Sequence, residues 1–364
     1  MARNGNVRVA DQPPTIGSPH FTTLRVGTPR AGGPAQRGKP MKAAVYTRYG
    51  PPDVVQITDV EKPVPTDNEV LIRVRAASVN PLDWHYLRGT PYFLRVMAGL
   101  RKPKVTRLGV DVAGQVEAVG RSVTQFKPGD EVFGSCRGAF AEYVCTSESA
   151  LAMKPDNVTF EQAASVCVAA LTALQGLRDK GHIQPGQRVL INGAAGGVGT
   201  FAVQIAKWFG ANVTGVCSAR NGDMVRSIGA DRVIDYTQED FTKSGHRYDL
   251  ILDCVGNHSL SACRRVLNPE GIYIAVGGPS GRWMIGPLAS AIAALVLSRF
   301  VRQKLVMVLM RRSKEDLTIM HELMKAGKVT PTIDKRYRLS EVPEAIRYLE
   351  EGHARGKVAI TLGY

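Results

Sequence analysis

Asn192-Gly193-Ala194-Ala195-Gly196-Gly197-Val198-Gly199 is the stretch that decides the fold of this chain. It follows an apolar run at 188–191, which predicts a buried strand, and it precedes 200–207, whose apolar spacing predicts a helix. A glycine-rich turn between a strand and a helix lets backbone N–H groups approach a pyrophosphate at the helix N-terminus. Another apolar run, at 212–217, lies at the distance expected for a βαβ unit. The stretch therefore predicts a dinucleotide-binding turn.

After this turn, predicted strands and helices alternate along the sequence. Strands are expected at 188–192, 212–217, 231–235, 249–254 and 271–276, with helical stretches between them. This alternation predicts an α/β fold with a doubly wound parallel sheet and helices on both of its faces. The part that begins at Met41 alternates apolar and polar residues between Gly and Pro, which predicts an all-β unit. After a helix expected at 316–326, a strand-like run at 357–362 indicates a return to that first unit.

The end of the strand expected at 212–217 distinguishes between two nicotinamide dinucleotides. A site for NADH usually places Asp or Glu there to bind the ribose 2′-hydroxyl, and such a carboxylate would repel the 2′-phosphate of NADPH. This chain has Ser218-Ala219-Arg220-Asn221 instead, and the first carboxylate is Asp223. A hydroxyl and a guanidinium bind phosphate through charge-assisted hydrogen bonds. We therefore expect NADPH as the cofactor, with Ser218 and Arg220 among its ligands.

Composition and charge limit the other classes of protein. The 364 residues carry a net charge of +15, part of it in residues 1–40, a basic segment rich in Gly and Pro. We expect a disordered basic extension there, because it lacks the apolar core of a secretory signal and the pattern of an amphipathic transit helix. The charge has no nucleic-acid-binding motif with it, so no nucleic-acid partner is expected. The six cysteines lack C-x-x-C spacing, as expected for reduced thiols in the cytoplasm.

One long apolar stretch, from Trp283 to Ser298, carries no charge and is followed by five basic residues up to Arg312. It is short for a membrane span, and Gly286 and Pro287 interrupt its start. We interpret it as a helix that covers a substrate cavity or a subunit contact. Peripheral contact of 283–312 with a membrane surface is the alternative.

Four motifs carry a resemblance to a known family. They are 192–199, Val168-Ala169-Ala170-Leu171-Thr172-Ala173, Gly109-Val110-Asp111-Val112-Ala113-Gly114 and Arg355-Gly356-Lys357-Val358. From Met41 onward the chain resembles the medium-chain dehydrogenase/reductase superfamily, and within it the zinc-independent quinone oxidoreductase branch. The resemblance implies a Rossmann domain inserted in a GroES-like β domain, with the active site in the cleft between them. We expect a GroES-like catalytic domain at 41–165, a Rossmann NADPH-binding domain at 166–315 and a return to the catalytic domain at 316–364.

The resemblance also implies a site without a metal. Zinc-dependent members have Gly-His-Glu where this chain has Gly109-Val110-Asp111, and they have a cysteine near the position of Asn80. A catalytic zinc needs three protein ligands, and two of them are missing here.

Without a metal, hydrogen bonds must polarise the substrate oxygen, and the resemblance places Asn80 beside the nicotinamide as the donor. His85 stands where relatives have Lys or Tyr and is the candidate proton donor. Tyr86 and Tyr92 are alternatives, and a structural role for His85 stays open. Asp83 either orients a neighbour or stabilises the turn after Asn80.

The remaining positions of the implied cofactor site follow the family's motifs. They lie in the glycine-rich turn, on a helix, at strand ends and in the returning segment: Gly193, Ala195, Gly196, Gly197, Val198, Thr172, Tyr236, Cys254, Val255, Gly277, Gly278 and Lys357. The missing side chains of Gly277 and Gly278 would allow close approach. For Lys357, a solvated surface charge is an equal alternative.

These features predict a cytoplasmic, zinc-independent, NADPH-dependent reductase that transfers hydride to quinones or α,β-unsaturated carbonyls. An enoyl-thioester or aldehyde/alcohol oxidoreductase is one alternative, and a non-catalytic, membrane-associated cofactor-binding protein is another. The expected partner is a small-molecule carbonyl or quinone. The resemblance further implies a homodimer, paired through the outer edge of the Rossmann sheet near 271–277.

Overall fold

The computed structural model describes residues 39–276 and 302–363. Residues 1–38 of the expected extension, Gly277, Gly278 and the apolar stretch at 283–298 therefore lie outside the described residues. The extension was predicted to reach residue 40, but Pro40 already begins a strand.

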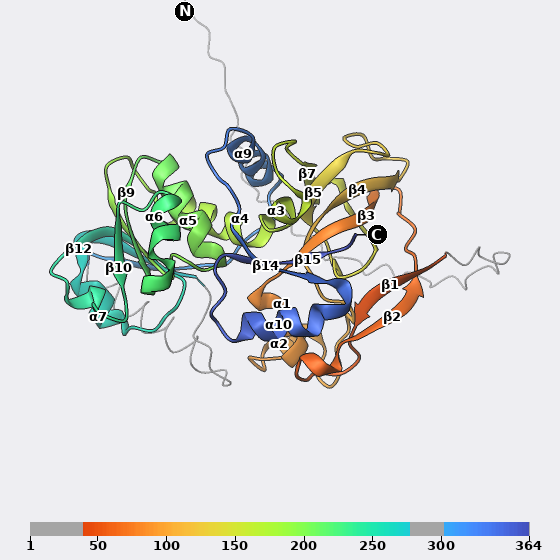
Figure 1. Ribbon diagram of the computed structural model, residues 1–364, viewed down its shortest axis with the longest axis horizontal. Coiled ribbons are helices and arrows are strands. Elements are labelled where there is room, and N and C mark those ends of the chain that lie inside the picture. The colour runs from red at the N-terminus through yellow and green to blue at the C-terminus, as the bar shows by residue number, and fades with distance from the viewer. Residues whose placement is uncertain (1–38, 277–301, 364) are drawn as a thin grey trace, which may run out of the picture. The chain divides into compact units, whose positions relative to one another are not determined.

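The glycine-rich turn belongs to a parallel sheet. Its strands are β8 (Arg188–Asn192), β9 (Asn212–Cys217), β10 (Arg232–Asp235), β11 (Tyr248–Asp253), β12 (Leu267–Val276) and β13 (Lys304–Val308). Within the described ranges their order is β10-β9-β8-β11-β12-β13, and every neighbouring pair is parallel. The chain thus winds outward from β8 in both directions, which is the doubly wound arrangement predicted from the sequence. Figure 1 shows β9, β10 and β12 on the green and cyan side of the molecule.

Both faces of this sheet are buried, because alternate residues of its strands enter different apolar clusters. Val189 and Ile191 of β8 pack with residues of α4 (Cys167–Gln175), α5 (Gly197–Trp208) and α9 (Lys314–Lys325). Leu190, between them, packs instead with Phe241 of η5 (Phe241–Lys243) and Cys263 of α7 (Leu260–Arg265). Two shorter helices, η4 (Ala219–Asn221) and α6 (Gly222–Ser227), connect β9 to β10.

The outer strand of this sheet differs from the expectation. The helix predicted at 283–298 lies outside the described residues, but the basic stretch after it contains the strand β13, which pairs with β12 from Ile272↔Lys304 to Val276↔Val308. The sheet edge expected at 271–277 is therefore wrong, because β12 lies between β11 and β13. The alternation in Lys304-Leu305-Val306-Met307-Val308 is short, and pairing with β12 fixes it as a strand.

A second, largely antiparallel sheet holds the other described strands except β1 and β2. Its order is β14 (Ile333–Arg338), β15 (Lys357–Thr361), β3 (Glu69–Val79), β4 (Asp111–Val119), β5 (Glu131–Ser135) and β7 (Leu151–Met153), with β6 (Tyr143–Ser147) also pairing with β3. A hairpin of β1 (Pro40–Val45) and β2 (Gln56–Glu61) packs with it. The strand β15 pairs with β3 antiparallel, so the last segment of the chain does reach the first sheet.

Helices interrupt the unit that was predicted as all-β. They are α1 (Pro81–Arg88), α2 (Leu94–Ala98), η1 (Pro52–Val54) and η2 (Glu148–Ala150). The helix α3 (Phe160–Ala164) follows this unit, and a π-helical turn at Gly176–Lys180 follows α4. Near the end of the chain, η6 (Leu339–Glu341) leads into α10 (Val342–Glu350), which contacts α1 (Figure 1). Among the described helices, none combines the length and the apolarity that a membrane span requires.

Candidate active site

The glycine-rich turn lies at the carboxyl end of β8, where the order in which successive strands are added changes direction. The chain passes from β8 to β9 on one side, whereas β11 pairs with β8 on the other. In doubly wound sheets, ligands bind outside the carboxyl ends of the strands at this switch point. The ends of β9, β10 and β11 bring Ser218, Tyr236 and Cys254 to the same edge of the sheet, because the strands are parallel and in register.

The backbone of the turn fits a pyrophosphate. Gly193 has φ +83°, and a Cβ on Gly199 would lie 2.0 Å from the Gly193 carbonyl oxygen, so side chains are excluded at both positions. Gly196 is the N-cap of α5, and the first turn of that helix carries no acidic residue. The first N–H groups of α5 lack partners inside the helix and carry the positive end of its dipole. The turn therefore offers N–H donors to a phosphate oxygen.

The residues predicted to select NADPH follow β9 directly. Ser218 is half-buried, and its Oγ accepts a hydrogen bond from Asn221 Nδ2 at 3.2 Å. Arg220 is exposed, and its guanidinium donates to the carbonyl oxygen of His353 at 3.3 Å. The Tyr236 ring is 55% exposed after β10. The arrangement leaves a guanidinium at the strand end and places no carboxylate between Cys217 and Asp223.

The end of β11 is organised by a buried carboxylate that the sequence analysis did not single out. Asp253 Oδ1 accepts from the N–H groups of Val255 and Gly256 at 3.0 and 2.8 Å, and Oδ2 accepts from the Tyr273 hydroxyl at 2.7 Å. Burial raises the pKa of the neighbouring Cys254 thiol, so the thiol stays protonated. Asp253 thus fixes the loop that carries Cys254 and Val255.

The returning segment contacts the glycine-rich turn. The Gly356 N–H donates to the Ala195 carbonyl oxygen at 2.8 Å, and a Cβ on Gly197 would lie 3.2 Å from Lys357 Cδ. Thr172 on α4 is buried and its hydroxyl donates to the Val168 carbonyl oxygen at 2.6 Å. Lys357 is therefore no solvated surface charge, since it is 3% exposed.

Lys357 joins a buried polar network with Asn80 and Asp111. Its Nζ donates to Asn80 Oδ1 at 2.5 Å and lies 3.6 Å from Asp111 Oδ2. Asp111 Oδ2 also accepts from Ser78 Oγ at 3.0 Å and from Asn80 Nδ2 at 2.9 Å. Burial lowers the pKa of Lys357, whereas the Asp111 carboxylate opposes that shift. Of these residues, Asn80 and Asp111 lie at positions where zinc-dependent relatives were expected to hold metal ligands.

The network corrects the expected role of Asn80. Its Nδ2 donates both to Asp111 and to the Ser78 carbonyl oxygen, and the side chain is 1% exposed. An amide nitrogen has two hydrogens, so none is left for a substrate oxygen. In this arrangement Asn80 is a positioning residue that links Lys357 to Asp111.

Asp83 is fixed by the start of α1. Its Oδ2 accepts from the Asn80 N–H at 2.8 Å, and Oδ1 accepts from the Gly109 N–H at 2.9 Å. The residue thus completes a capping box with the N-cap Asn80. Burial raises the pKa of Asp83 to about 7, although the two backbone donors oppose that shift. Both functions left open for Asp83 are met, since it caps the helix and also orients the Gly109 turn.

His85 lies inside α1 and not in a loop. Its Nδ1 is 2.7 Å from the Thr90 carbonyl oxygen, which can only accept, so Nδ1 carries the hydrogen. The ring stacks on Trp84 with centroids 3.7 Å apart. Burial lowers the pKa of His85, so at neutral pH the ring is neutral and Nε2 is an acceptor.

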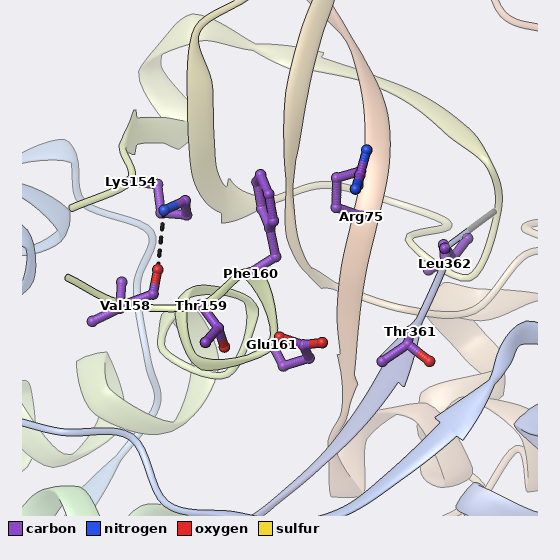
Figure 2. A pocket seen from close by; sticks show the side chains of 9 residues that line it. Arg75, Lys154, Val158, Thr159, Phe160, Glu161, Thr361 and Leu362 are labelled. Atoms are coloured by element: carbon purple, nitrogen blue, oxygen red, sulfur yellow. Dashed lines mark hydrogen bonds between the residues drawn. The ribbon is translucent and has the colours of Figure 1, made fainter. Parts of the chain in front are cut away.

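Two hollows in the described residues lie away from this network. One of about 240 Å³ is lined by Arg75, Lys154, Phe160 and Thr361, among others, as Figure 2 shows. The Lys154 ammonium there donates to the Val158 carbonyl oxygen at 3.0 Å (Figure 2). It also pairs with the Glu131 carboxylate. The other, of about 430 Å³, is lined by Arg73, Arg338 and the same end of β15. Thr361 ends β15, whereas Lys357 begins it, so neither hollow contains the network.

The sheet order, the glycine-rich turn and the buried network define a dinucleotide-dependent dehydrogenase or reductase of two sheets. Family models agree with this class: an alcohol dehydrogenase GroES-like domain matches residues 66–156, and a zinc-binding dehydrogenase domain matches residues 228–360. In the described residues, no group of three His, Cys, Asp or Glu side chains could hold a metal ion.

Relatives and solved structures match nearly the whole chain. A chloroplast envelope quinone oxidoreductase homolog of Arabidopsis thaliana is 34% identical over 339 residues, which cover 89% of this chain and 99% of that protein. The mitochondrial NAD(P)H oxidoreductase RTN4IP1 of Mus musculus is 35% identical over 361 residues, 90% of each chain. The quinone oxidoreductase structure from Coxiella burnetii is 31% identical, with a TM-score of 0.78 over 89% of this chain and 100% of that one.

The chain belongs to the medium-chain dehydrogenase/reductase superfamily and, within it, to the quinone oxidoreductase branch. It is an oxidoreductase that uses a nicotinamide cofactor, built from a GroES-like domain and a Rossmann domain. The predicted cytoplasmic location is wrong, because the relatives from Arabidopsis thaliana and Mus musculus, among others, are named as chloroplast or mitochondrial proteins. Free thiols fit those compartments as well as the cytoplasm, so the cysteine pattern could not decide between them.

Proposed function

We propose that this protein is an NADPH-dependent reductase of quinones or α,β-unsaturated carbonyls that works without zinc. The observation that carries the proposal is the buried network of Lys357, Asn80 and Asp111, in which Asn80 and Asp111 stand where zinc-dependent members were expected to have metal ligands. The Lys357 ammonium, held by Asp111, supplies a fixed positive charge beside them without a metal ion. The relatives named as quinone oxidoreductases support the substrate class.

The cofactor-binding residues follow from the edge of the parallel sheet. The first N–H groups of α5, at Gly197 and Val198, bind the pyrophosphate, while Ser218 and Arg220 bind the 2′-phosphate. Thr172, Cys254 and Val255 lie toward the nicotinamide side. The reduced nicotinamide supplies the hydride, and the protein supplies orientation and electrostatics.

His85 is our candidate for moving the proton. With Nδ1 fixed on Thr90, its free Nε2 takes up a proton and passes it on, and the lowered pKa requires acidic pH for that step. We therefore expect the single-turnover rate of the native protein to rise below pH 6.5, and we expect His85→Asn to lose that rise. A native rate that does not change between pH 5 and 8 would exclude this role.

The deciding experiment is NADPH oxidation against a panel of quinones, enones and aldehydes, with metal analysis of the same sample. We expect turnover with quinones or enones, full activity after chelation and no stoichiometric zinc. Turnover with aldehydes alone, or one tightly held zinc per chain, would overturn the proposal.

A further inference from the structure

An outward-facing apolar surface follows α1, and we name it the 92–105 surface. Its apolar side chains and their exposed fractions are Tyr92 48%, Phe93 42%, Val96 69%, Met97 77%, Leu100 70% and Val105 47%. Single exposed apolar side chains are ordinary on a protein surface. Six of them in one short segment form a patch of the kind that marks an interaction site.

The backbone of this segment is folded, so its apolar side chains are held outward. The Arg95 guanidinium donates to the Gly89 carbonyl oxygen at 3.0 Å and lies over the Tyr49 ring, 4.5 Å from its centroid. The Tyr49 hydroxyl donates to the Gly99 carbonyl oxygen at 2.6 Å. The short helix α2 is thereby fixed beside α1 (Figure 1).

The same segment is strongly basic. From Trp84 to Val110 the chain contains no Asp or Glu, yet it contains six basic residues: Arg88, Arg95, Arg101, Lys102, Lys104 and Arg107. Arg101, Lys102 and Lys104 are exposed, and no described acidic residue pairs with them. Their charge is available to an outside partner.

We propose that the 92–105 surface docks this protein on an anionic lipid bilayer. Exposed apolar side chains next to lysine and arginine match a membrane interface, where the apolar groups enter the acyl boundary and the cations meet lipid phosphates. Neither hollow described above is lined by these residues. A bilayer accepts apolar side chains without a complementary pocket, and the exposed cations beside them favour an anionic surface. The 92–105 surface is a different segment of the sequence from 283–312.

The test is flotation of the full chain with vesicles of phosphatidylcholine alone or with 30% phosphatidylglycerol, at low and high salt. We expect binding to the anionic vesicles only, weakened by salt. The variant Met97→Glu/Leu100→Glu should bind at least tenfold more weakly. The variant Arg101→Gln/Lys102→Gln/Lys104→Gln should lose about fivefold for each charge, on the order of 100-fold in all. The readout involves no turnover, so it is independent of the proposed function.

Matched controls change exposed residues elsewhere. Val64→Glu replaces an apolar side chain that is 80% exposed, and Lys325→Gln/Lys328→Gln/Arg336→Gln removes three exposed charges; both should bind as the native chain does. The proposal is overturned if the native protein does not bind anionic vesicles. So does equal binding by Met97→Glu/Leu100→Glu, or a loss of self-association in that variant with vesicle binding intact.

Discussion

At the scale of single residues, Lys357 and Asp111 form a buried pair whose partners depend on each other. We expect Lys357→Met to lower the free energy of unfolding by about 3–5 kcal/mol, because it leaves the Asp111 carboxylate buried without a cation. Urea unfolding measures this change. The double variant Lys357→Met/Asp111→Asn should recover much of the loss, since no uncompensated charge remains. A Lys357→Met protein as stable as the native chain would show that the pair is not formed.

Arg220 tests the choice of cofactor at the same scale. Replacing it with Ala should weaken NADPH binding by about 1.5–3 kcal/mol, the value of a hydrogen bond to a charged group, and leave NADH binding nearly unchanged. Titration of both cofactors measures the two affinities. Arg226→Ala is the control, because that exposed residue on α6 pairs with Asp223. Equal native affinities for NADPH and NADH would refute the preference.

The sequence identified many residues of the candidate site but not their hydrogen-bond partners. Asn80 was expected to face the substrate, yet its amide is bound to residues of β3, β4 and β15. Those strands are far apart in the chain, so only the sheet pairing brings Ser78, Asp111 and Lys357 to one amide. Asp253 was not predicted as a site residue, because no local sequence pattern marks a buried carboxylate at the end of a strand.

At the scale of elements, the start of α1 depends on Asp83. A raised carboxyl pKa means that the folded chain binds this proton more tightly than the unfolded chain does. The Asp83 contribution to stability is therefore largest below about pH 4, is lost as the pH rises toward about 7, and changes no further above that. Through this group, the slope of the free energy of unfolding against pH reaches at most about 1.4 kcal/mol per pH unit.

Asp83→Asn should remove this slope, although it also weakens the capping box. Unfolding free energies of both proteins at pH 5, 6, 7 and 8 give the comparison. The absolute stabilities will differ, so the evidence lies in the change with pH alone. Parallel curves for the two proteins would contradict the assignment to Asp83.

Elements with regular apolar spacing were predicted well, and the others were not. The strands from β8 to β12 and the helix α5 lie within a few residues of their predicted positions, because buried parallel strands are continuous apolar runs. The helix α1 was missed even though Asn80, Pro81 and Asp83 form a readable capping signal. The strand β13 was not predicted, because the interpretation of this region rested on the charge-free stretch 283–298 that precedes it. Only the pairing with β12 identifies β13 as a strand.

At the scale of the whole molecule, β13 replaces β12 as the edge through which we propose a homodimer. Among the described strands, β13 has a partner on one side only, so its outer N–H and C=O groups can pair with a second copy across a two-fold axis. Met307 on this strand is 38% exposed. We expect Met307→Lys to convert the dimer into monomers, because a charge on an edge strand opposes pairing.

Sedimentation velocity at micromolar concentration measures the change, with Val64→Lys as a control for added charge outside this sheet. The native chain and the control should sediment as dimers, and Met307→Lys should sediment as a monomer with an intact far-UV spectrum. A native monomer would exclude the dimer. A Met307→Lys dimer would place the contact elsewhere, either at β10, the opposite edge of the described sheet, or outside the sheet altogether.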